Sequence, residues 1–153
     1  MATLNGNQYK QAYVDVPSSK IKPGDVSGDK KIMFFDFDIT AAPTNGDILK
    51  LGKIPAGVRV VDLVLSFPDL GTAGSLNVGW AASANGVEAA DADGFLAAVD
   101  VNTAAATVNM SEQANMPGLL KEFAAECDLQ IDIATAWTVT SGKIKGYLAY
   151  VII

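Results

Sequence analysis

Carboxylates at closely spaced positions are the residues of this 153-residue chain that could do chemistry. They occur as three pairs: Asp36 with Asp38, Asp91 with Asp93, and Asp128 with Asp132. Two facing carboxyl groups can serve as acid and base in glycoside hydrolysis, and carboxylates are also the main ligands of calcium. A spacing of two or four residues on a β-strand, however, simply places such side chains together on the face exposed to water.

The surroundings of these pairs favour the solvated face. Asp36 and Asp38 alternate with apolar residues, and so do Asp128 and Asp132. The residues after Asp93 do not complete a calcium-binding loop, and a helix N-cap is the better interpretation of the third pair. Carboxylate pairs alone are a weak sign of catalysis.

The remaining catalytic residue types are missing or poorly placed. The chain contains no histidine, which excludes Ser-His-Asp and Cys-His nucleophiles and removes the usual base at neutral pH. Cys127 is the single cysteine, and it alternates with Leu129 and Ile131 in a pattern typical of a buried strand face. We therefore predict a protein that is not an enzyme and that uses no cofactor or metal.

Aromatic residues are the better candidates for contacts with a partner. Trp80 alternates with apolar residues and is expected in the core, whereas Trp137 lies in a Thr-rich loop as either an exposed contact or a loop anchor. Tyr9, Tyr13 and Val16 stand in a polar segment, where they favour docking onto another chain over a frayed terminus. Our predicted partner contacts are Tyr9, Tyr13, Val16 and Trp137.

Composition excludes several classes of partner. The formal net charge is −6, with 11 basic and 17 acidic residues, so neither nucleic acid nor an anionic membrane is expected to bind. Half of the residues are hydrophobic and only 18% are charged, which suggests that part of the surface faces protein. A lone cysteine permits no internal disulfide, which fits a reducing compartment. No apolar run resembles a signal peptide or a membrane span. We therefore expect synthesis in a cytoplasm.

The pattern along the chain predicts an all-β, mainly antiparallel domain preceded by an arm. Residues 1–29 are polar, rich in proline and glycine, and are expected to form an extended arm; residues 30–153 are expected to form the domain. Period-2 alternation and turn residues predict strands at 30–40, 47–51, 58–67, 75–81, 107–110, 119–134 and 143–152. A short helix is predicted at 91–99. This order, without a βαβ rhythm, favours one β-sandwich or jelly roll.

Two predicted strands specify the core most clearly. In the 58–67 strand, Val61, Leu63, Leu65 and Phe67 are assigned to one face, and Val58, Val60 and Val64 to the other. In the 119–134 strand the inward face is predicted to hold Phe123, Ala125, Cys127, Leu129, Ile131 and Ile133. Apolar residues on both faces of the first strand indicate that it is covered on both sides.

The middle third of the chain resembles a family of virion proteins. The segments GDILKLGKIPAGVRVVDLVLSFPDLG (46–71), LNVGW (76–80) and DADGFLAAVDV (91–101) are, in this order, similar to small structural proteins of tailed bacteriophages that decorate or cement the capsid. The resembling segments are turns and strands, so the resemblance implies a fold and a virion role but assigns no functional residue.

The resemblance implies a protein that binds the outside of a phage capsid and stabilises the shell, made in the host cytoplasm and located on the capsid surface. Its partners would be the major capsid protein and further copies of itself, with a homotrimer expected ahead of a dimer. A tail or fibre component that binds a receptor or glycan is the alternative. The number of copies per particle separates the two.

Overall fold

Nine β-strands and one 3-10 turn build the part of the chain that the computed structural model describes, residues 28–102, 104–114 and 117–153. The elements are β1 (Lys30–Ile39), β2 (Ile48–Ile54), β3 (Val58–Phe67), β4 (Ser75–Trp80), β5 (Asp91–Asp100), β6 (Ala106–Asn109), η2 (Met110–Glu112), β7 (Glu122–Phe123), β8 (Cys127–Thr135) and β9 (Gly142–Ile152). The predicted arm falls almost entirely on residues 1–27, which lie outside the described residues.

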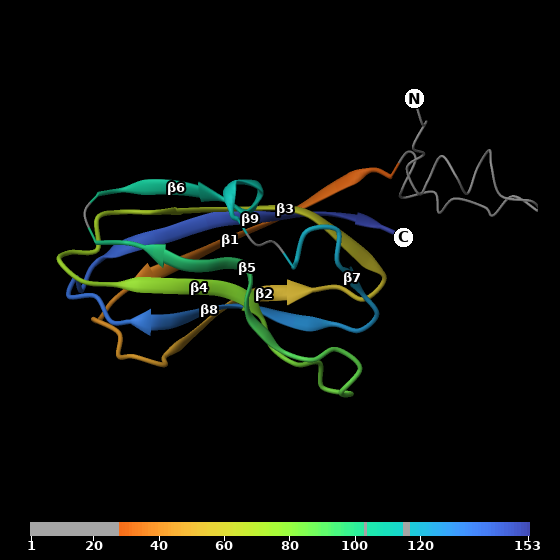
Figure 1. Cartoon of the computed structure of the whole chain (residues 1–153), viewed down its shortest axis with the longest axis horizontal. Helices are drawn as coiled ribbons and strands as arrows, with labels where there is room; N and C mark the ends of the chain where they lie inside the picture. Colours follow the sequence, from red (N-terminus) through yellow and green to blue (C-terminus); the bar gives the residue numbers. More distant parts are fainter. Residues whose placement is uncertain (1–27, 103, 115–116) are drawn as a thin grey trace, which may run out of the picture.

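The strands form two antiparallel sheets that lie one above the other (Figure 1). One sheet has the order β1-β9-β3-β6, with β7 also paired to β3, and the other has the order β2-β8-β4-β5. Along the chain, β1 and β2 belong to different sheets, and the same holds for β3 and β4, β5 and β6, and β8 and β9. This interleaving of strands between a five-stranded and a four-stranded layer is the jelly-roll arrangement, which confirms the predicted fold class.

The core lies between the sheets and receives every second side chain from both. The predicted inward faces of β4 and of the 119–134 segment are confirmed, since Leu76, Val78 and Trp80 are at most 3% exposed and Ile131 and Ile133 at most 1%. Trp80 lies at the centre of an aromatic cluster, with its ring centroid 5.0 Å from that of Phe95 and 5.1 Å from that of Phe123.

A β-bulge in β3 corrects the predicted faces of that strand. The register with β9 shifts between Val60 and Asp62, and this shift turns Val61 away from the core. The inward set is therefore Val58, Val60, Leu63, Leu65 and Phe67, all at most 3% exposed. The prediction of strict alternation across the whole strand was therefore wrong. The bulge adds one residue, so the side chains before Val61 point to the opposite face from the one that strict alternation assigns to them.

The predicted helix at 91–99 is a strand. β5 pairs with β4 from Asp91 to Asp100, with register shifts on either side of Val78. The spacing of Phe95, Leu96 and Val99 looked helical, yet a bulged strand buries the same three side chains. Pairing with β4 satisfies the backbone of a segment too short to be a stable helix alone.

Candidate assembly surface

The structure describes one of the four predicted contact residues, and that residue is buried. Tyr9, Tyr13 and Val16 lie outside the described residues, and their role stays a prediction. Trp137 is only 2% exposed and packs in the core, so it anchors its loop and offers no exposed contact. Its loop crosses the end of the sandwich, where Gly74 approaches it so closely that an added Cβ would lie 3.1 Å from the Trp137 Cβ.

The carboxylates on β1 belong to an exposed ion-pair group. Lys143 on β9 places its Nζ 2.7 Å from Asp36 Oδ2 and 3.1 Å from Asp38 Oδ1. The hydrogen bond from Lys143 lowers the pKa of Asp36, and the hydrogen bond to Asp36 is the main cause that raises the pKa of Lys143. Both carboxylates face water, as the solvated-face interpretation predicts.

The outer face of the β2-β8-β4-β5 sheet is also polar. Lys50 Nζ lies 2.7 Å from Asp128 Oδ2 and lowers the pKa of that carboxyl, while Lys53 Nζ lies 2.6 Å from Glu126 Oε1. Gln130 Nε2 donates a hydrogen bond of 2.9 Å to Asp132 Oδ2. This face carries ion pairs and amides across neighbouring strands, which suits a surface in contact with water.

Asp91 and Asp93 stand at the start of β5 and cap no helix, which corrects that part of the prediction. Burial is the main cause that raises the pKa of Asp91, and the next is a hydrogen bond that the protonated Asp91 carboxyl donates to Asp93. Within the described residues, no group of three or more Asp, Glu or Cys side chains is placed to hold a metal ion.

Cys127 has the properties of a core residue. Its side chain is 2% exposed, and its Sγ lies 3.7 Å from the carbonyl oxygen of Ala125. Burial is the main cause that raises the pKa of the thiol. Because the thiolate is the reactive form, a buried thiol with a raised pKa is a poor nucleophile.

Apolar side chains gather instead on the outer face of the β1-β9-β3-β6 sheet. Phe34 is 76% exposed and Ile32 is 47% exposed, both on β1. The Phe34 ring meets the ring of its cross-strand neighbour Tyr147 edge-on, with 6.3 Å between centroids. Val64 on β3 is the next residue in this row. An open groove of about 400 Å³ follows the row, and Asp36, Ser66 and Lys145 line its polar end.

The two outer faces of the sandwich thus differ in character. Both carry ion pairs and each exposes an isoleucine, Ile48 on β2 or Ile32 on β1, but only the β1-β9-β3-β6 face adds an exposed phenylalanine beside a groove. Contiguous exposed apolar side chains mark surfaces that other molecules cover. Ile32 and Phe34 were not predicted as surface residues from the sequence, although a signal was present. They alternate in step with Asp36 and Asp38, so they belong to the strand face on which polar residues are expected.

Comparison with known proteins places this fold among phage capsid components. No family model matches the chain, and no curated protein matches its sequence. A chain in the capsid of Ralstonia phage GP4 is similar over 84% of this chain and 88% of its own length, with 25% identity and a TM-score of 0.68. A chain in the capsid asymmetric unit of cyanophage Pam1 is similar over 93% of this chain and 99% of its own length, with 18% identity and a TM-score of 0.62.

These similarities confirm the resemblance to structural proteins of phage virions. The match covers 88% and 99% of the lengths of the two capsid chains, so the similarity extends over nearly the whole of each. The similarity supports a structural role in a virion. In the described part of the chain, no helix is long and apolar enough to cross a membrane.

Proposed function

We propose that this protein binds the outer surface of a phage capsid as a homo-oligomer, a trimer by expectation, and stabilises the assembled shell. The observation that carries the proposal is the similarity to two phage capsid chains over nearly their whole length. The major capsid protein is the proposed partner. The exposed groove of the β1-β9-β3-β6 sheet supports protein contacts, and its lining is mainly apolar.

Charge and composition support the outer position. A chain with a net charge of −6 is repelled by packaged nucleic acid, so the outside of the shell is the favourable side. A decorating protein that binds assembled capsid better than free subunits stabilises the shell by mass action. Contacts repeated over a lattice add together, so each one can be weak.

The test compares particles that carry this protein with particles from a phage that lacks its gene. Both are heated in the presence of a dye that reports released genome. Bare particles should release the genome at a lower temperature, and adding the purified protein back should restore the difference. Equal heat resistance together with a loss of attachment to host cells would contradict the proposal and support the receptor-binding alternative.

A control separates capsid binding from a general solute effect. Bovine serum albumin, added at the same concentration, should leave the release temperature of bare particles unchanged. The copy number per particle, measured by quantitative gel electrophoresis, should be in the hundreds for a decorating protein. A few copies per particle would place the chain in a tail or fibre instead.

A further inference from the structure

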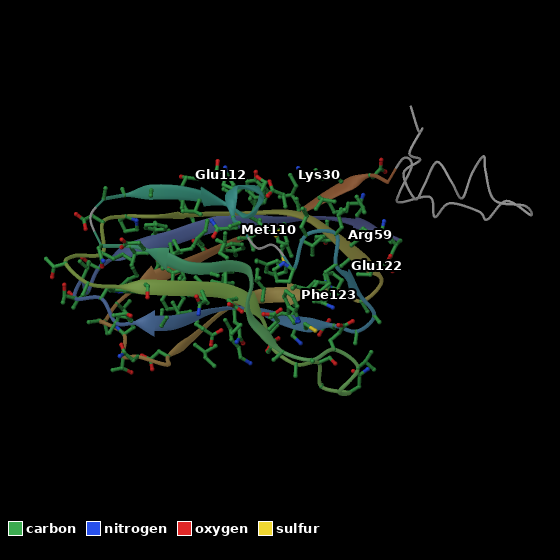
Figure 2. The ribbon with its side chains drawn as sticks, viewed as in Figure 1. Lys30, Arg59, Met110, Glu112, Glu122 and Phe123 are labelled. Atoms are coloured by element: carbon green, nitrogen blue, oxygen red, sulfur yellow. The ribbon has the colours of Figure 1, made fainter. Side chains whose placement is uncertain are left out.

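Within residues 28–153 as far as they are described, β1 lies at the edge of its sheet, and one side of its backbone pairs with no strand there. Among the described residues β1 pairs with β9 along its full length, from Lys30 to Ile39, and with no other strand. The strand has ten residues and reaches the end of the sandwich, where Lys30 is labelled (Figure 2). A long edge strand with exposed apolar side chains is a template for pairing with a further chain.

The outward side chains of β1 are complementary to themselves in the reversed direction. In chain order they are Lys30, Ile32, Phe34, Asp36 and Asp38, a cation, two apolar residues and two anions. If a second β1 runs antiparallel with Met33 opposite Met33, Lys30 faces Asp36 of the second copy and Ile32 faces Phe34. The four outward positions from Lys30 to Asp36 then meet a matching partner, and the fifth, Asp38, lies opposite residue 28 of the second copy, before the start of its strand. Matched cross-strand pairs of this kind stabilise sheets.

The neighbouring register is less favourable. With Phe34 opposite Phe34, Lys30 would face Asp38 of the second copy, but each Ile32 would face Asp36, an apolar group beside a carboxylate. The register centred on Met33 avoids this mismatch at both ends of the contact. A two-fold axis through its centre repeats every contact twice, as an isologous interface requires.

The charges on β1 are available for this pairing. Asp36 accepts its hydrogen bond from Lys143 through Oδ2, which leaves Oδ1 for a second cation. Lys143 also contacts Asp38 at 3.1 Å and so keeps a carboxylate partner. Lys31 is the one charge on the inward side of β1, and its exposed, flexible side chain can carry the ammonium group away from the pairing line.

We propose that two copies of this chain pair antiparallel along β1, with Met33 opposite Met33, so that one sheet continues from each copy into the other. The inference deepens the homo-oligomer part of the proposed function. A two-fold contact produces a dimer, or it joins neighbouring trimers on a shell. Free purified protein is sufficient to test it, so its failure is distinct from a failure of capsid stabilisation.

The first test is a disulfide across the contact. The variant with Ile32→Cys and Phe34→Cys places two cysteine pairs opposite each other, and under mild oxidation it should run at twice 15.9 kDa on a non-reducing denaturing gel. Phe34→Cys alone faces Ile32 in the proposed register and should cross-link far less. Native Cys127 is 2% exposed and does not compete.

The second test reverses the charges. Lys30→Asp and Asp36→Lys should each weaken self-association about tenfold at low salt. Each substitution places like charges opposite each other, and the two-fold axis makes this contact occur twice in the dimer. An equimolar mixture of the two variants should associate as strongly as the wild type. In a dimer that contains one copy of each variant, opposite charges again face each other at both contacts between positions 30 and 36. Sedimentation velocity measures these constants, and thermal melting by circular dichroism checks that each variant folds.

Two results would overturn the proposal. One is the absence of a covalent dimer for the double-cysteine variant, both in free protein and on the particle. The other is a mixture of charge variants that associates no better than either variant alone. Equal cross-linking by Phe34→Cys alone would overturn the register centred on Met33.

Discussion

Lys121 places its ammonium group between the carboxylate of Glu88 and the aromatic cluster of the core. Its Nζ lies 2.8 Å from Glu88 Oε2, 5.3 Å from the centroid of the Trp80 ring and 4.9 Å from that of Phe123. The other oxygen of Glu88 accepts a hydrogen bond of 2.7 Å from the backbone N–H of Ala124. The pair therefore ties the loop between β4 and β5 to the segment around β7.

Replacing Glu88 by glutamine should destabilise the fold by about 1–3 kcal/mol at pH 7, the range for a lost charged partner in a largely buried site. The hydrogen bond from Lys121 is the main cause that lowers the pKa of Glu88 below its ordinary value of 4.5, against the opposing effect of burial. A carboxyl whose pKa falls on folding stabilises the native state above its unfolded pKa, and this contribution is lost as the pH falls through the folded value. The difference between wild type and Glu88→Gln should therefore shrink below about pH 4.5, measured by urea unfolding between pH 3 and pH 7.

Glu126→Gln is the matched control for this change. The side chains of Glu126 and its partner Lys53 are 55% and 65% exposed, and surface ion pairs contribute less than about 1 kcal/mol. An equal loss of stability in the two variants would contradict a special role for the Glu88–Lys121 pair.

Ile131→Ala should cost about 2–5 kcal/mol, because this side chain is fully buried and the change leaves a cavity. Asp132→Ala, one position further along β8, should cost less than about 1 kcal/mol because that side chain points to the polar outer face. Denaturant unfolding of both variants measures the contrast. Similar losses at the two positions would show that β8 is not buried on one side only.

Gly94→Ala should cost about 1–3 kcal/mol, because a Cβ at this position would lie 2.2 Å from Cζ3 of Trp80 and overpack the core. Had residues 91–99 been a helix, the same change would have stabilised the protein by about 0.5–1 kcal/mol. Thermal unfolding of the purified variant decides between the two.

Ala98→Gly provides the control within the same strand. Ala98 has a φ of +49°, where glycine is unstrained, so the change should leave stability within about 0.5 kcal/mol of wild type or raise it. In a helix this change would cost about 1 kcal/mol. A clear loss at Ala98 together with a gain at Gly94 would contradict the strand.

Removing residues 1–20 should leave the melting temperature of the isolated domain nearly unchanged and weaken its binding to particles. The reason is the polar composition of this segment, in which Tyr9, Tyr13 and Val16 are better suited to contacts with another chain than to a core. Calorimetry and a pelleting assay with particles measure the two effects. A large drop in the melting temperature would show that the segment is part of the fold.

Much of this protein could be predicted from local pattern. Alternation along 30–39 and 122–133, with turn residues between the strands, predicted an all-β sandwich and named inward residues such as Leu129 and Ile131 correctly. These features depend on the two-residue period of a strand, which neighbouring residues alone define. The missing histidine and the lone cysteine likewise required no structure to exclude the common catalytic sites.

Only the tertiary structure decided the features that depend on distant partners. Pairing with β4 made a strand of 91–100, the bulge at Val61 reversed the faces of β3, and packing buried Trp137 in a loop that looked exposed. It also left β1 at the edge of its sheet, with Phe34 uncovered. In each case the free energy comes from contacts between residues far apart in the chain, and a local pattern carries no information about which strand will lie beside which.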